Sequence, residues 1–167
     1  VPADSTIISI GIAPFTNWRT LIVQCTNSLY AFDIDPMLPN FAHAKQVSSI
    51  VLADGFPFVF DPGSSAPFTV EDVDSNRRLE VIIAAENQVY IVDYSGSNIS
   101  PASMYLGESD GSGISSGAMA VDIDGDGKIE TIGSFAFNRL AIWEDNFRMK
   151  RDYPVSFGAR SRHLPFF

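Results

Sequence analysis

A strand–turn–strand pattern that occurs three times is the feature that most restricts how this chain can fold. The three copies are TLIVQCTNSLYAFD (20–33), EVIIAAENQVYIVD (80–93) and ETIGSFAFNRLAIWE (130–144). The first two align without a gap, so that Asn27 matches Asn87 and Tyr30 matches Tyr90. Each copy starts with a nearly continuous apolar run, which is typical of a strand buried on both faces. A second run, rich in aromatic and β-branched residues, predicts the partner strand.

Further apolar stretches flank each copy. One precedes it at 5–13, 66–73 and 117–123, and a more variable one with Pro or Gly follows at 53–60, 102–107 and 145–157. Residues 41–52 fit either a helical turn or an outer strand. The repeating unit is therefore expected to hold four short strands.

This organisation predicts an all-β fold, a β-propeller segment of about three four-stranded antiparallel blades in an incomplete ring. The whole chain, 1–167, is expected to be one such segment, with blades at approximately 5–60, 66–107 and 116–157 and the start of a further blade at 158–167. Propellers have about four to eight blades, so three cannot close a ring. We therefore expect the chain to be part of a longer protein.

The most specific motif is DIDGDGKIE (122–130), which joins the first two strands of the third unit. The predicted ligands are Asp122, Asp124, Asp126, the Lys128 carbonyl and Glu130. Oxygen atoms at alternate positions of a tight loop can converge on a hard cation, and calcium takes six to eight of them. The intervening glycines allow the positive φ that such a loop needs. The motif predicts a calcium site.

Two other interpretations of this motif exist. An EF-hand or dockerin loop needs a carboxylate at its twelfth position and a following helix. Gly133 occupies that position here, and the residues after Glu130 favour a strand. A plain acidic hairpin turn is the remaining alternative, because Asp and Gly are ordinary turn residues.

The second unit holds a weaker version of the motif, DVDSNRRLE (72–80). The corresponding ligands are Asp72, Asp74, Asn76, the Arg78 carbonyl and Glu80. Ser75 and Arg77 replace the two glycines, which weakens the prediction of a second calcium site. The alternative is a hydrogen-bonded turn in which Arg77 or Arg78 neutralises the acids. The matching stretch of the first unit, 12–20, has no acid, so no metal is expected there.

Composition excludes several classes of function. The net charge of −9 disfavours nucleic acid as a partner. No apolar run is long enough to span a membrane, and the single cysteine, Cys25, excludes an internal disulfide. The chain has no GxSxG, HExxH or phosphate-loop motif, and His43 and His163 are isolated, so no catalysis is expected.

The bases are distributed unevenly along the chain. Five of the 11 lie in the last 20 residues, namely Arg148, Lys150, Arg151, Arg160 and Arg162. This run predicts either a solvated outer strand and loop or a patch for an acidic partner.

The pattern of a small or apolar strand, DIDGDGKIE, and two further apolar strands resembles the FG-GAP or VCBS-type repeat. Such repeats are the blades of the integrin α-subunit-like β-propeller and of many secreted bacterial propellers. The resemblance covers nearly the whole chain as three blades. It implies calcium at both acidic loops, which brace the blade and are not catalytic. It therefore implies a calcium-stabilised segment for adhesion or protein–protein interaction.

The ion suggests a compartment, because loops of this kind generally need more calcium than resting cytosol holds. We expect an extracellular, secreted or lumenal protein. Expected partners are another protein or the remaining blades of the same propeller, with a glycan as a further candidate. One alternative is the propeller portion of a secreted carbohydrate- or lipid-active enzyme whose catalytic residues lie elsewhere. Another is a structural repeat that closes or stacks with partner copies, because its edge strands are unpaired.

Overall fold

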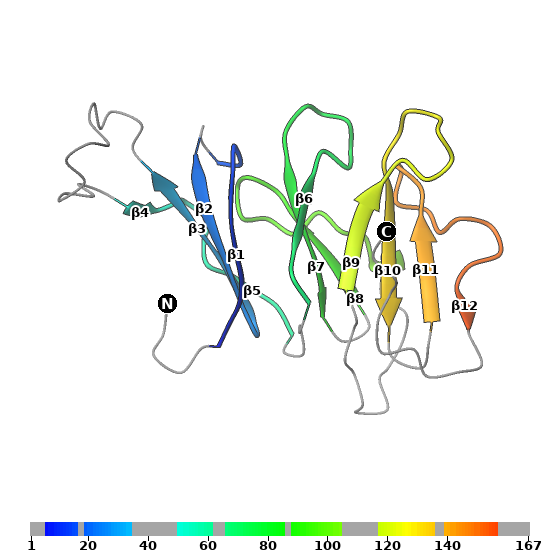
Figure 1. Cartoon of the computed structure of the whole chain (residues 1–167), viewed down its shortest axis with the longest axis horizontal. Helices are drawn as coiled ribbons and strands as arrows, with labels where there is room; N and C mark the ends of the chain where they lie inside the picture. Colours follow the sequence, from blue (N-terminus) through cyan, green and yellow to red (C-terminus); the bar gives the residue numbers. More distant parts are fainter. Residues whose placement is uncertain are drawn as a thin grey trace.

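Three antiparallel β-sheets stand side by side in the computed structural model (Figure 1). The structure describes residues 6–16, 19–34, 50–61, 66–85, 88–104, 117–135 and 139–156. These residues contain no α-helix, and no helix among them is long and apolar enough to span a bilayer. The prediction of an all-β, incomplete propeller segment is confirmed. The expectations for His43, His163 and residues 158–167 lie outside the described residues.

The first sheet has five strands. They are β1 (Ile7–Ala13), β2 (Thr20–Cys25), β3 (Ser28–Ile34), β4 (Ile50–Leu52) and β5 (Phe58–Val59). The order is β1-β2-β3-β4, and β5 also pairs with β3 beyond the end of β4. Of the two alternatives for residues 41–52, the strand is the one that the structure shows at residues 50–52. The outer position of this blade is thus shared by two short strands.

Among the described residues, the second sheet has three strands instead of the predicted four. They are β6 (Thr69–Glu71), β7 (Glu80–Ala85) and β8 (Gln88–Val92). In place of a fourth strand, a single bridge pairs Val92 with Asn98, and residues 102–104 form a short 3₁₀ helix, η2 (Ala102–Met104). The η2 turn closes when the Met104 N–H donates to the Pro101 carbonyl at 3.0 Å. This turn directs Met104 into the core, where it is fully buried.

The third sheet has the four strands that the sequence predicts. They are β9 (Gly117–Val121), β10 (Glu130–Phe135), β11 (Arg139–Trp143) and β12 (Val155–Ser156), in the order β12-β11-β10-β9. In all three sheets the first two described strands pair antiparallel and the third pairs with the second.

Two hydrophobic clusters hold the sheets together. One lies between the first and second sheets and includes Ile22, Leu29 and Ile83. The other lies between the second and third sheets and includes Ile82 and Trp143. Strand β7 is buried along its whole length, because its two faces contribute to the two clusters. Each buried Val or Ile side chain of β7 contributes about 1.5–3 kcal/mol to folding.

Side-chain hydrogen bonds also join neighbouring sheets. The Gln24 side chain donates to the Ala66 carbonyl at 3.1 Å, and the Thr69 hydroxyl donates to the Ala118 carbonyl at 3.1 Å. The loops that connect β1 to β2, β6 to β7 and β9 to β10 all lie at one end of the sheets (Figure 1). This end therefore gathers the loops in which the acidic motifs occur.

Candidate metal-binding loops

The two acidic motifs fold into loops that share two hydrogen bonds. We call them the 72–80 loop, between β6 and β7, and the 122–130 loop, between β9 and β10. In the 72–80 loop, Asp72 Oδ2 accepts the Arg77 N–H at 2.8 Å, and Glu80 Oε2 accepts the Val73 N–H at 3.0 Å. In the 122–130 loop, the same bonds run from Gly127 to Asp122 at 2.9 Å and from Ile123 to Glu130 at 2.9 Å.

The backbone conformation is also the same in both loops. Gly125 and Gly127 have φ values of 79° and 85°, and the matching residues Ser75 and Arg77 have values of 60° and 70°. A Cβ atom on either glycine would meet nothing within 4 Å, so the requirement is conformational and not steric. The two substitutions that weakened the sequence prediction therefore leave the loop shape unchanged. They add strain of about 1–2 kcal/mol per residue.

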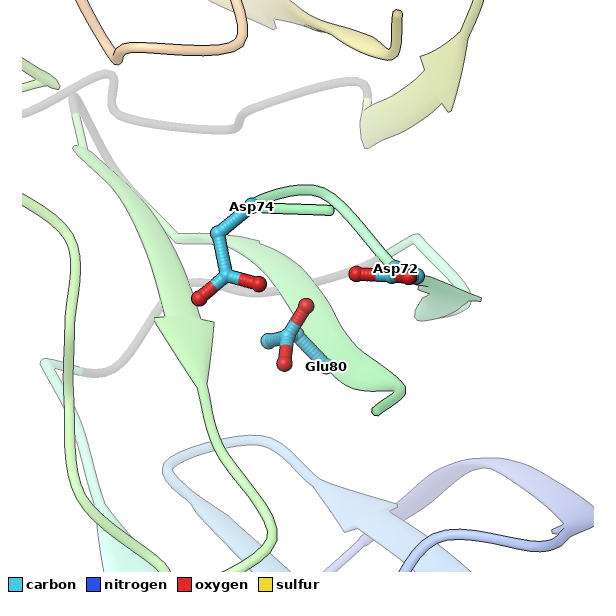
Figure 2. Close-up of side chains that lie close together, drawn as sticks. All are labelled: Asp72, Asp74 and Glu80. Carbon is cyan, nitrogen blue, oxygen red and sulfur yellow. The ribbon is translucent and has the colours of Figure 1, made fainter. Parts of the chain in front are cut away.

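Three carboxylates converge in each loop. Asp72, Asp74 and Glu80 offer oxygen atoms that all lie within 4.8 Å of one another, and the side chains point toward a common region (Figure 2). Asp122, Asp124 and Glu130 form the matching group. The glutamate of each group is the first residue of a central strand and is at most 1% exposed. Either group can supply the oxygen ligands of a metal ion.

The other predicted ligands are held by hydrogen bonds within their loops. Asn76 Oδ1 accepts the Arg78 N–H at 2.8 Å, and Asp126 Oδ1 accepts the Lys128 N–H at 2.9 Å. The Asn76 amide also donates to Asp74 at 2.8 Å. Asp126 is not one of the three carboxylates that converge in the 122–130 loop.

Buried oxygen atoms without partners distinguish the 72–80 loop. Within the described residues, Asp72 Oδ1 and Glu80 Oε1 are buried and have no hydrogen-bond partner. Burial, together with the charges of Asp74, Asp72 and Asp93, raises the pKa of Glu80 to about 7, against the lowering effect of the Val73 hydrogen bond. A buried carboxylate oxygen without a partner is costly. A cation at this position would remove that cost.

The proposed neutralisation by arginine is not what the structure shows. Arg78 lies over the ring of Tyr94, with its guanidinium carbon 4.1 Å from the ring centre. Arg77 is exposed, and its backbone N–H is the group that bonds Asp72. In the described part of the chain, no salt bridge joins either arginine to the three carboxylates.

Two lysines at the 122–130 loop form ion pairs. Lys150, from the segment after β11, lies 2.9 Å from Asp124 Oδ2 and 3.1 Å from Glu144 Oε1. The Lys150 contact lowers the pKa of Asp124, and Asp124 and Glu144 together raise the pKa of Lys150. Lys128 turns away from the loop and lies 3.0 Å from Asp145, which raises the pKa of Lys128.

Sequence reasoning missed the role of Lys150. The only signal was the group of five bases near the end of the sequence, which was interpreted as a solvated outer strand and loop or a patch for an acidic partner. Lys150 is separated from Asp124 by 26 positions, and no local pattern pairs the two residues. Arg160 and Arg162 lie outside the described residues.

The first sheet has a different arrangement at the same place. Thr16 Oγ1 donates to Asp33, and the Thr16 N–H donates to the Thr20 hydroxyl at 3.1 Å. Thr20 is the first residue of β2 and so occupies the position of Glu80 in β7. Hydroxyl groups and one carboxylate thus connect the segment after β1 to β2 and β3 here.

These sheets and loops define a propeller-like repeat domain. Residues 72–132 match the family model described as an FG-GAP-like repeat. The matched stretch begins with the 72–80 loop and ends just after the 122–130 loop, so the resemblance to an FG-GAP-type repeat is confirmed for it. No curated protein matches the chain.

Proposed function

We propose that this chain is a calcium-stabilised, non-catalytic β-propeller segment that serves adhesion or protein–protein interaction outside the cell. The FG-GAP-like repeat and the propeller-like sheets support the structural part of this proposal. The ion, its location and the partner are the parts to be tested.

The observation that carries the proposal is the buried, partnerless oxygen of Glu80. This side chain is fully buried, and Asp72 contributes a second oxygen of the same kind beside it. Asp74 completes the group (Figure 2). Carboxylates gathered in this way repel one another unless they take up a proton or a cation.

The donor set favours calcium among biological cations. The converging groups are carboxylates only, and hard cations prefer oxygen ligands. Calcium tolerates flexible geometry, whereas magnesium demands near-ideal octahedral coordination. Asp72, Asp74 and Glu80 would hold one ion, and Asp122, Asp124 and Glu130 would hold another. A bound ion stabilises the folded chain, because the site does not exist in the unfolded chain.

Thermal unfolding of the metal-stripped chain tests the proposal. The midpoint is expected to rise on addition of calcium and to respond far less to magnesium. Combining Asp74→Ala with Asp124→Ala should abolish the rise, because each loop then loses one carboxylate. Asp152→Asn is the control for loss of charge, since Asp152 is exposed in the turn before β12 and lies outside both loops. A double variant that responds to calcium as the unchanged chain does would refute the calcium sites.

An apolar face of the first sheet supports the interaction part of the proposal. Ile10 and Ile12 are 61% and 67% exposed on β1, and their β2 partners are Val23 and Leu21. At the other edge of the same face, Leu52 is 39% exposed and pairs with Phe32. The interleaved residues of β2 and β3 point instead toward the second sheet.

This face would accept a further blade, packed as the second sheet packs on the first. Sedimentation over a range of concentrations tests whether that blade comes from a second copy. Self-association that Ile10→Ser with Ile12→Ser abolishes would assign the face to pairing between copies. A chain that stays monomeric at high concentration would exclude a second copy as the occupant.

A further inference from the structure

The second and third sheets carry different residues at the matched position that, in the third sheet, lies beside the acidic loop. In the third sheet, the Lys150 N–H donates to the Ile142 carbonyl at 2.7 Å, and Trp143 bridges to Met149. In the second sheet, the Ile99 N–H donates to the Ile91 carbonyl at 2.8 Å, and Val92 bridges to Asn98. Ile99 therefore occupies the position of Lys150. An apolar side chain packed on the core replaces an ammonium group.

The backbone hydrogen bond from Lys150 to Ile142 determines which groups the lysine side chain can contact. From this anchor on β11, the ammonium spans Asp124 of the 122–130 loop and Glu144 at the end of β11, at 2.9 Å and 3.1 Å. The lysine side chain is 26% exposed, so it is partly shielded from solvent. No salt bridge of the described residues offers the 72–80 loop a comparable ammonium.

We propose that Lys150 is a built-in counter-ion that lowers the calcium affinity of the 122–130 loop. The inference rests on the proposed function, because it concerns how one of the two calcium sites is tuned. A divalent ion held by Asp124 would lie close to the ammonium that contacts the same carboxylate. Like charges a few ångströms apart weaken binding by about five- to tenfold even in water. Calcium would also have to compete with the Lys150–Asp124 salt bridge, which would lower the affinity further.

The counter-ion opposes the advantage of the stronger motif. The 122–130 loop has one carboxylate more than the 72–80 loop, since Asp126 matches Asn76. Its glycines also adopt positive φ without strain. Lys150 offsets part of this advantage, so that the calcium affinities of the two loops become more similar than their sequences predict.

Calcium titration by calorimetry, with one loop disabled at a time, tests the inference. In chains carrying Asp74→Ala, the remaining site is the 122–130 loop. Adding Lys150→Ile, which installs the residue of the second sheet, should tighten this site about five- to tenfold. Lys150→Arg keeps the charge and should leave the affinity low. Arg148→Met is the matched control, since it removes an exposed charge from the same segment.

A reciprocal arm separates this effect from general changes in charge. In chains carrying Asp122→Ala, which removes one of the converging carboxylates of the 122–130 loop, Lys150→Ile should not change calcium binding by the 72–80 loop. Unchanged affinity of the 122–130 loop in Lys150→Ile would overturn the inference, as would equal tightening by Arg148→Met. If the unchanged chain takes up no calcium at all, the proposed function fails instead, so the two failures are distinguishable.

Discussion

The two acidic loops share one backbone and differ in how their charge is balanced. Both have one matching amide bond to the first aspartate and one to the buried glutamate. In the 122–130 loop, Asp122 Oδ1 also accepts the Gly125 and Asp126 N–H groups, whereas the matching Asp72 Oδ1 has no partner. The 122–130 loop has an ammonium on Asp124, whereas the 72–80 loop has two buried oxygens without partners. The motif that is weaker by sequence therefore has the greater need of a cation. The match of a loop to the acidic motif indicates how well the loop can bind a cation. The number of its carboxylate oxygens without a partner indicates how much the stability of the fold depends on that binding.

The largest expected effect is the pH dependence of the metal-stripped chain. Glu80 has a pKa of about 7 in the folded chain against an ordinary value of 4.5, so the folded chain retains its proton where the unfolded chain has lost it. Stability should therefore fall as the pH rises from about 4.5 to 7, by on the order of 3 kcal/mol. Urea unfolding at a series of pH values, with and without calcium, measures this. Calcium should flatten the slope, and a metal-free slope of zero would contradict the prediction.

Substituting Glu80 sharpens the comparison of the two loops. Glu80→Gln keeps an acceptor for the Val73 N–H and removes the charge, so the metal-stripped variant should gain about 2–3 kcal/mol at pH 8 and lose its pH slope. The same variant should weaken the calcium response of the 72–80 loop. Glu130→Gln is the matched change in the other loop. An identical gain in both variants would show that the loops do not differ as proposed.

The next largest expected difference between the two loops is in the stability effects of substitutions at their positive-φ positions. Ser75→Gly and Arg77→Gly place glycine where φ is already positive, so each should stabilise the chain by about 1 kcal/mol. Gly125→Ala and Gly127→Ala should destabilise it by about 1–2 kcal/mol each, because alanine disfavours the left-handed region. Chemical denaturation of the four variants measures the effects. Stabilisation by alanine in the 122–130 loop would contradict the assigned loop conformation.

The smallest effect concerns the second lysine of the 122–130 loop. Lys128 forms an exposed ion pair with Asp145, and such pairs contribute little. Lys128→Met should leave the thermal midpoint of the metal-stripped chain unchanged within error. A clear loss of stability would show that Lys128, and not only Lys150, balances the charge of this loop.

The sequence was sufficient for the hairpins and the positions of the loops. The apolar runs at 80–85 and 88–92 became β7 and β8, because a buried central strand needs apolar residues on both faces. The acidic spacing also identified the carboxylates that converge. These features are local, and short-range pattern determines them.

The features that were missed depend on contacts between distant residues. The fourth strand predicted in the second unit is replaced by a bridge and the η2 turn, which delivers Met104 to the core between the second and third sheets. Lys150 reaches Asp124 only because its backbone pairs with β11. The positive φ of Ser75 and Arg77 follows from the surrounding loop, which overrides the preference of the residues themselves. None of these contacts leaves a short-range signature.

The position of Glu80 has a consequence for how the molecule opens. Glu80 begins β7, whose side chains pack against both hydrophobic clusters. Binding of an ion by the 72–80 loop therefore acts directly on β7, which is buried along its whole length. Amide hydrogen exchange along β7 should slow when an ion occupies the loop, since exchange there requires opening of the core. The exchange rate of the buried β7 amides would then depend on whether the 72–80 loop at the surface holds an ion.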